Sequence, residues 1–221
     1  TSTLLAVGNG NKIEKIKEIY TPNSLGRFYG VITEALGFRR FNDEEKVMGL
    51  ACFGKPDVDL SDVIKIGRGS YETKLGNIKA DLKKGEITDM HKNLAASAQK
   101  SLERAAIALK DYLYDITGYK KLCLAGGVAL NCDMNSAVFQ SGNVDDIFIQ
   151  PAANDPGLAI GAPLEFLGAK AGFAGSYFGP EYSNEQIKAY LDECKMDYEY
   201  IEDIENFVGE EILPKSYITG W

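Results

Sequence analysis

Short apolar runs and helical patterns alternate along this chain, and their order predicts an α/β fold. Leu122–Ala125 is a short apolar run that ends at Gly126 and Gly127, and a helical pattern follows directly. Ile147–Gln150 is a second such run, and it is followed by a helical pattern that begins near Asp155. Two strand–loop–helix units in succession are typical of a layered α/β sheet, in which ligands bind where strand ends meet helix N-termini.

The N-terminal quarter of the chain is predicted to form a hairpin followed by two helices. Thr3–Val7 and Ile13–Ile19 are β-prone runs, and the Asn/Gly-rich residues between them are typical of a hairpin turn. Apolar residues then recur at helical spacing over 25–36, directly after Ser24, a residue type that favours helix N-caps. A second, shorter helix is predicted over 43–52.

The longest helical pattern covers Ile87–Thr117. Apolar residues recur every three or four positions along it, and Gly118 is the expected stop. This helix is expected to pack its apolar face on the sheet that starts at Leu122. Residues 57–86, which precede the helix, predict at most a small polar hairpin, and we interpret them as a surface excursion.

Two domains are predicted, at 1–172 and 173–221, with a glycine-rich linker over 171–180. The elements expected after the linker are a helix, a strand, a helix and a strand, at Asn184–Cys194, Tyr198–Ile201, Ile204–Ile212 and Tyr217–Trp221. Because the chain begins and ends in strand-like segments, we expect it to be a piece of a longer protein.

Composition and charge exclude several classes of function. The net charge of −8 over 221 residues argues against a protein that binds chiefly the phosphates of nucleic acid. No apolar run approaches the ~20 residues that span a membrane, and no secretory signal is visible. The four cysteines lack metal-site spacing, and we interpret them as reduced, mostly buried thiols of a cytoplasmic protein.

Two glycines at a strand end are the first candidate for chemistry. Gly126 and Gly127 let backbone N–H groups approach an anionic ligand closely, and the dipole of the helix that follows adds to the attraction. Asn131, one turn further on, could donate to a phosphate or a ribose oxygen. Paired glycines are equally common as a tight connector, and the pattern is neither a Walker A loop nor a GxGxxG fingerprint.

Acidic side chains are the second group of candidates, and each has a structural interpretation beside the functional one. Asp155 before Pro156 is an ordinary helix start, but a carboxylate there could also ligate a metal or a metal-bound phosphate. The acids at 43–45 form either a solvated first helical turn or an acceptor for ribose hydroxyls. His91, the single histidine, is predicted to be a partly exposed surface residue, and it cannot build a multi-histidine metal site alone.

Two segments around these candidates are the most distinctive, AGGVALNCDMN and FIQPAANDPGLAIGA. They resemble the NodU/CmcH carbamoyltransferase family, which includes nodulation protein U and O-carbamoyltransferases of the cephalosporin and tobramycin type. Further family-like segments follow the family order: PNSLGRFYGVITEALGF, EEKVMGLACFGKP, NLAASAQKSLE and FGPEYS. The resemblance therefore covers essentially the whole chain.

The resemblance implies a fold and a reaction. Residues 1–172 would be the second lobe of an actin/sugar-kinase/Hsp70-like (ribonuclease H-like) ATPase fold, with a mixed sheet and packed helices. Residues 173–221 would be a linker and the start of a C-terminal region. The full-length enzyme would form carbamoyl-adenylate from carbamoyl phosphate and ATP, and would pass the carbamoyl group to a hydroxyl of a sugar, an antibiotic or a Nod factor.

The resemblance also assigns roles to residues, although it assigns no catalytic one. The nucleotide loop would comprise Gly126, Gly127, Val128 and Asn131. Glu45 would match an acid near the ribose in related proteins, and Asp155 would match the aspartate that ligates an active-site divalent metal, iron in relatives. The paired histidines of that metal site and an arginine-rich region are absent from this sequence. We therefore expect this chain to be inactive alone and to bind metal weakly.

Two other functions stay open from the sequence. A tRNA threonylcarbamoyl transferase has a related ATPase-like fold, but the acidic charge and the NDPGLAIGA segment disfavour it. The other is a non-catalytic ATPase-fold lobe that serves assembly. The partners expected for the leading function are small molecules, carbamoyl phosphate and a hydroxylated acceptor, whereas the oligomeric state does not follow from the sequence.

Overall fold

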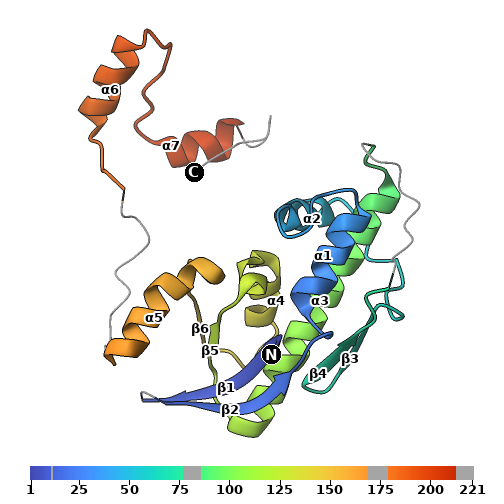
Figure 1. Ribbon diagram of the computed structural model, residues 1–221. Coiled ribbons are helices and arrows are strands. Elements are labelled where there is room, and N and C mark those ends of the chain that lie inside the picture. The colour runs from blue at the N-terminus through green and yellow to red at the C-terminus, as the bar shows by residue number, and fades with distance from the viewer. Residues whose placement is uncertain (11, 77–85, 169–178, 213–221) are drawn as a thin grey trace. The chain divides into compact units, whose positions relative to one another are not determined.

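The chain is a mixed α/β protein that forms two compact units, Thr1–Gly172 and Phe173–Trp221. The computed structural model describes residues 1–10, 12–76, 86–168 and 179–212. All elements that surround the candidate site belong to the first unit (Figure 1).

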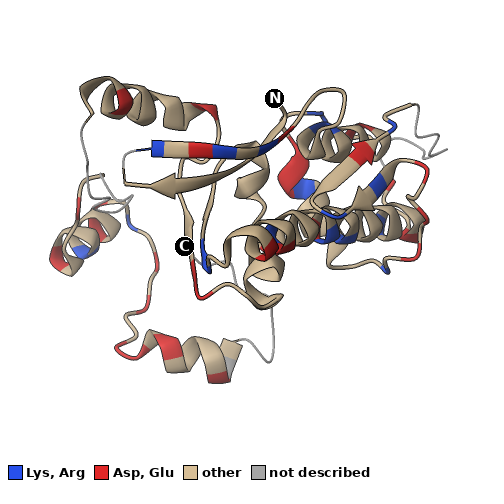
Figure 2. Cartoon of the chain, turned by 90° about the horizontal axis from the view of Figure 1, so that it is seen from below, with Lys and Arg blue, Asp and Glu red and all other residues tan. Residues whose placement is uncertain are grey.

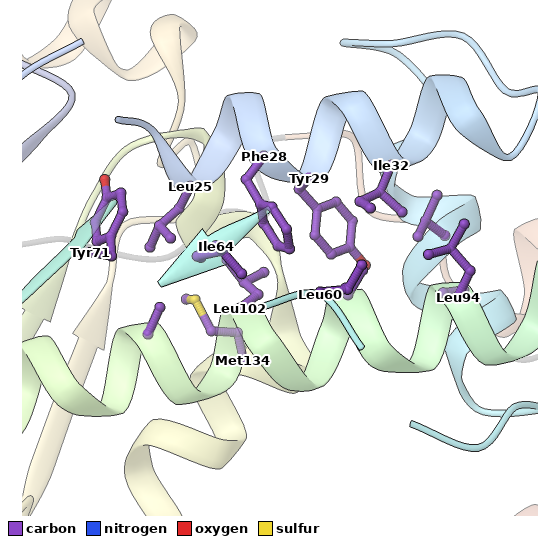
Figure 3. Packing of buried hydrophobic residues seen from close by; sticks show 14 of the residues in the cluster. Leu25, Phe28, Tyr29, Ile32, Leu60, Ile64, Tyr71, Leu94, Leu102 and Met134 are labelled. Atoms are coloured by element: carbon purple, nitrogen blue, oxygen red, sulfur yellow. The ribbon is translucent and has the colours of Figure 1, made fainter. Parts of the chain in front are cut away.

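A single long helix, α3 (Asp89–Thr117), is the element on which the first unit is built. It ends as predicted at Gly118, whose φ of 67° is a left-handed conformation that stops a helix. One face of α3 is buried at helical spacing through Leu94, Ala95, Ala98, Leu102, Ala105 and Leu109. Figure 3 shows apolar side chains of other elements directed at this face, so its burial is the main hydrophobic contribution to the unit.

Both short helices predicted near the N-terminus are present, and they pack on α3. They are α1 (Leu25–Ala35) and α2 (Glu44–Ala51). The predicted cap of α1 is confirmed, because the Ser24 hydroxyl accepts the Arg27 N–H at 3.2 Å. Phe28 of α1 is fully buried in the shared core, so the apolar periodicity of this helix marks the side that faces α3.

The small hairpin expected within residues 57–86 is confirmed, but its interpretation as a surface excursion is wrong, because the described part of this segment contributes to the core. β3 (Ile64–Gly67) and β4 (Ser70–Thr73) form an antiparallel hairpin that packs on α3. The buried apolar side chains of this segment are Leu60, Ile64 and Tyr71. Alternation over four residues is a weak signal, and only packing against α3 decides which side of the hairpin faces inward.

The N-terminal hairpin is confirmed. β1 (Thr3–Asn9) pairs antiparallel with β2 (Lys12–Ile19), with Thr3 opposite Ile19 and an irregularity after Leu5. Leu5 and Ile19 are buried in the core cluster, whereas the residues near the turn are exposed. The hairpin is thus anchored through its inward side chains.

Two strand–loop–helix units follow each other, as the sequence predicted. Their elements are, in order, β5 (Lys121–Leu124), the 3₁₀ turn η1 (Gly127–Leu130), α4 (Cys132–Gln140), β6 (Asp146–Ile149), the 3₁₀ turn η2 (Asp155–Gly157) and α5 (Leu158–Leu167). β5 and β6 pair in parallel, with Leu124 opposite Ile149. Each predicted helix therefore begins only after a short 3₁₀ turn.

The described part of the second unit contains two helical segments. α6 (Asn184–Glu193) begins after Ser183, whose hydroxyl accepts the Gln186 N–H at 3.3 Å, as its cap signal predicts. The other helical segment comprises α7 (Ile204–Asn206) and the π-helical η3 (Phe207–Ile212).

Other predictions for this region are wrong or fall outside the described residues. Tyr198–Ile201, predicted as a strand, is neither strand nor helix, because no described segment pairs with it. The domain boundary after residue 172, most of the linker over 171–180 and the strand at 217–221 lie outside the described residues.

Two predictions about side-chain exposure are also wrong. His91 is buried rather than partly exposed. Its Nδ1 accepts the Thr88 N–H at 3.1 Å, which forms part of a capping box at the start of α3. The four cysteines are free thiols, but all are exposed. On β5, for example, Cys123 lies on the exposed side of the strand, between partly buried Leu122 and Leu124.

Among the described residues, no helix combines the length and the apolar character that crossing a bilayer requires. In the view of Figure 2, acidic and basic residues are interspersed along the elements of the first unit. A distribution of this kind does not favour binding along nucleic-acid phosphates.

We predict that Phe28→Ala lowers the free energy of unfolding by about 3–5 kcal/mol, the usual cost of truncating a buried phenylalanine. Phe53, which is 72% exposed, provides the matched control. Phe53→Ala should change the free energy of unfolding by less than about 0.5 kcal/mol. Urea unfolding followed by circular dichroism measures both variants, and equal losses would contradict the core described above.

Candidate functional site

The loops that follow β5 and β6 lie side by side at the carboxyl ends of these strands. Parallel pairing places both strand ends at one edge. Beyond that edge the loops are joined directly, because the Gly126 N–H donates to the Ala153 carbonyl oxygen at 2.7 Å. The paired glycines and Asp155, two residues after Ala153, therefore belong to one edge of the strand pair.

The first loop leaves its backbone accessible. Gly126 has a φ of 99°, a conformation that residues with a Cβ rarely adopt. Apart from adjacent residues, no described atom lies within 4 Å of a Cβ built at Gly126 or Gly127. Val128, the next residue, packs partly buried against the core. A ligand can therefore approach the backbone of this turn closely while Val128 anchors it.

The second loop holds Asp155 in an exposed turn. Asn154 precedes η2, Asp155 is the first residue of η2, and Pro156 follows. This arrangement fits an ordinary helix start, although Asn154 rather than Asp155 takes the cap position. A Cβ at Gly157 would collide with the Ala152 carbonyl oxygen, so the tight turn requires glycine there. The turn leaves Asp155 exposed beside the first loop.

The residues around Asp155 do not by themselves fit a metal centre. Within the described ranges, no three His, Cys, Asp or Glu side chains gather closely enough to hold a metal ion. Iron-type centres need several protein ligands, and one carboxylate does not supply them. The role of Asp155 as a metal ligand therefore stays a prediction.

Asn131 makes its hydrogen bonds within the protein. Its Oδ1 accepts the Met134 N–H at 2.8 Å, which caps α4. Its Nδ2 donates to Gln99 Oε1 at 2.9 Å, and Gln99 Nε2 donates back to Asn131 Oδ1 at 3.0 Å. Both ends of the Asn131 amide thus have partners that support the loop, and a contact from Asn131 to a nucleotide stays a prediction.

Gln99, which the sequence reasoning missed, is only 5% exposed in α3. Its Oε1 also accepts the Tyr29 hydroxyl at 2.9 Å. Burial raises the pKa of the Tyr29 hydroxyl, so this group stays protonated and donates at neutral pH. The signal that could have found Gln99 is a single amide on the apolar face of the helix, between Ala98 and Leu102.

Glu45 is exposed in the first turn of α2. Met48 lies one turn later on the same side of that helix, and its sulfur is 3.8 Å from the Cys132 sulfur at the start of α4. This side of α2 therefore lies beside the helix that follows the glycine turn. The contact of Glu45 with a ribose stays a prediction.

A cavity of about 240 Å³ opens between α2, α3 and the first turn of α4. Its polar lining comes from Gln99, Lys100, Glu103 and Asp133. The cavity therefore borders Gln99, one member of the hydrogen-bonded amide pair.

The sequence matches known proteins over most of its length. The family model described as carbamoyltransferase N-terminus matches residues 1–164. An uncharacterized protein of Synechocystis sp. is 33% identical over 257 residues, which cover 100% of this chain and 42% of that protein.

Two nodulation proteins are also similar to the chain. Nodulation protein NolO of Bradyrhizobium diazoefficiens is 39% identical over 203 residues, covering 84% of this chain and 37% of NolO. Nodulation protein NolNO of Sinorhizobium fredii is 40% identical over 175 residues, covering 74% of this chain and 26% of NolNO. The chain thus spans less than half the length of these relatives.

The start of α2, next to Glu45, depends on the charge of Asp43. The Asp43 carboxylate accepts hydrogen bonds from the Lys46 ammonium at 2.8 Å and from the backbone N–H of Arg39 at 2.8 Å. These hydrogen bonds lower the pKa of Asp43 far below its usual range. Because the folded-state pKa is depressed, the stabilisation is fully present above the unfolded pKa of about 3.9 and is lost as the pH falls through the folded value.

We predict that Asp43→Asn lowers the melting temperature at neutral pH, and that the difference from wild type shrinks below about pH 4. Asp62→Asn, at an exposed carboxylate, is the control and should leave the neutral-pH melting temperature almost unchanged. Thermal unfolding, followed by circular dichroism from acidic to neutral pH, gives the melting temperatures of the wild type and both variants. A difference between wild type and Asp43→Asn that does not vary with pH would refute the assignment.

Proposed function

We propose that this chain, which belongs to the NodU-type carbamoyltransferase family, is the ATP-binding part of an enzyme that transfers a carbamoyl group. The whole protein would form carbamoyl-adenylate from carbamoyl phosphate and ATP. It would then pass the carbamoyl group to a hydroxyl of a sugar, an antibiotic or a Nod factor. The proposed location is the cytoplasm, where both of these phosphorylated substrates occur.

The observation that carries the proposal is the hydrogen bond between the two loops, from the Gly126 N–H to the Ala153 carbonyl oxygen. It brings a glycine turn with an accessible backbone and an exposed carboxylate, Asp155, to one edge of a parallel strand pair. This edge is where α/β sheets bind nucleotides, and backbone N–H groups at such turns suit phosphate oxygens.

The residues of this chain would contribute binding and orientation. The backbone at Gly126 and Gly127 would hold phosphate oxygens with preorganised N–H groups. Glu45, on the side of α2 that faces α4, would accept from the ribose hydroxyls. Asp155 would add one carboxylate to a divalent-metal site whose other ligands are not among the described residues.

The proposed fold is the second lobe of an actin/sugar-kinase/Hsp70-like ATPase. Residues 1–172 would be this lobe, and 173–221 would be the linker and the start of a C-terminal region. Helices packed beside a parallel strand pair, with the loops at the carboxyl ends of the strands, are compatible with such a lobe.

We predict that Gly126→Ala weakens ATP binding by roughly tenfold or more, because a Cβ forces the turn out of its φ of 99° and costs one or more phosphate contacts. Gly142→Ala is the matched control. Gly142 also has a positive φ, 84°, and an added Cβ would also meet open space. It lies after the C-terminal end of α4, whereas the glycine turn precedes the N-terminal end of that helix. Calorimetric titration of the full-length protein with Mg·ATP measures both dissociation constants.

A carbamoyl-transfer assay on the same preparations completes the test. Carbamoyl-transfer activity should be lower in Gly126→Ala and near normal in Gly142→Ala. Equal losses in both variants would show that backbone strain alone is responsible. A wild-type protein that neither binds ATP nor transfers carbamoyl would contradict the proposal and would favour a non-catalytic assembly role.

A further inference from the structure

We infer that Gln99 is a positioning residue for the ATP-binding turn. Gln99 lies in α3 and would act on the turn through its hydrogen bonds to Asn131. The inference rests on the proposed function, because it assigns to Gln99 the task of holding the turn in the shape that receives the nucleotide. It adds a residue from the middle of the long helix, far from the turn in sequence, to the binding machinery.

The hydrogen bonds of the Gln99 side chain define the geometry. Gln99 and Asn131 form a reciprocal amide pair, with N···O distances of 2.9 and 3.0 Å. The Tyr29 hydroxyl donates to Gln99 Oε1 at 2.9 Å, and Gln99 Nε2 also donates to Glu103 at 3.3 Å. Three partners from α1, α3 and the start of α4 therefore fix the orientation of one buried amide.

From Asn131 the hydrogen bonds continue into the glycine turn. The Asn131 N–H donates to the Val128 carbonyl oxygen at 3.0 Å, and the Ala129 N–H donates to the Gly126 carbonyl oxygen at 3.0 Å. The buried Asn135 amide donates to the Ala129 carbonyl oxygen at 2.8 Å. The position of Asn131 is thus coupled through short, direct bonds to the backbone of the turn.

Because Gln99 is buried, we infer that its amide is there to hold Asn131 in the cap position. An apolar side chain of similar size would fill the same space beside Ala98 and Leu102 without the cost of burying an amide. Replacing Gln99 would leave Asn131 Nδ2 without its acceptor and would free the Asn131 side chain to leave the cap position. Gln99 therefore selects one conformation of Asn131, and with it one start for α4.

The test compares Gln99→Met and Tyr29→Phe with Tyr71→Phe in the full-length protein. Met keeps the length of the side chain and removes the amide. Tyr29→Phe removes only the donor to Gln99. Tyr71→Phe is the matched control, because Tyr71 is 2% exposed and Tyr29 is 5% exposed, and its hydroxyl bonds to Thr3 at 2.6 Å, remote in sequence from the turn.

Two measurements are made on each variant: the ATP dissociation constant by calorimetry, and hydrogen exchange of the Met134 N–H, which Asn131 caps. Gln99→Met should weaken ATP binding by roughly tenfold, the effect of losing about one buried hydrogen bond, and should speed exchange at Met134. Tyr29→Phe should have the same two effects to a smaller extent. Tyr71→Phe should change neither the ATP dissociation constant nor exchange at Met134, even when urea unfolding shows that it destabilises the protein as much as Tyr29→Phe does.

The outcomes separate this inference from the proposed function. Unchanged exchange at Met134 in Gln99→Met would overturn the positioning role, whatever happens to ATP binding. Faster exchange with unchanged ATP affinity would show that Gln99 orders the cap alone, and would also overturn the inference. A wild-type protein that fails to bind ATP would refute the proposed function, and the nucleotide-binding part of this inference with it.

Discussion

Parallel pairing of β5 and β6 is the constraint on which the candidate site depends. Strands that run in the same direction must end at the same edge, so the loops that follow them are brought together whatever their sequence. The hydrogen bond from the Gly126 N–H to the Ala153 carbonyl oxygen then locks the two loops to each other. An accessible glycine turn and an exposed carboxylate at Asp155 share that edge as a consequence of topology, and the proposed nucleotide site follows from this placement.

Helix α3 connects the stability of the first unit to the shape of this edge. Its apolar face is buried against α1, α2 and the β3–β4 hairpin, and this burial holds the unit together. Among the buried polar residues of this helix, Gln99 reaches Asn131 at the start of α4. The same helix therefore supplies both the hydrophobic core and, through one amide, the support of the glycine turn. Tyr29 shows the same combination, since its ring lies in the core and its hydroxyl binds Gln99.

Most of the elements near the site could be predicted from sequence, because they depend on local signals. The cap at Ser24, the stop at Gly118 and the apolar runs of β5 and β6 each report their own backbone conformation. What could not be predicted depends on contacts between distant segments. The β3–β4 hairpin, for example, is buried because α3 covers it. The pairing of Gln99 with Asn131 joins residues that are 32 positions apart, so no local pattern could reveal it.

The most direct test of the shared edge is paramagnetic broadening by Mn²⁺·ATP in the amide NMR spectrum of the full-length protein. If the two loops face one nucleotide site, the amides of Gly126, Gly127 and Val128 should broaden together with those of Asn154 and Asp155. Amides of the turn between β3 and β4, which packs beside Tyr112 in the same unit, serve as the reference for non-specific broadening. Broadening at one loop without the other, or uniform broadening over the whole chain, would contradict a common nucleotide site at the ends of β5 and β6.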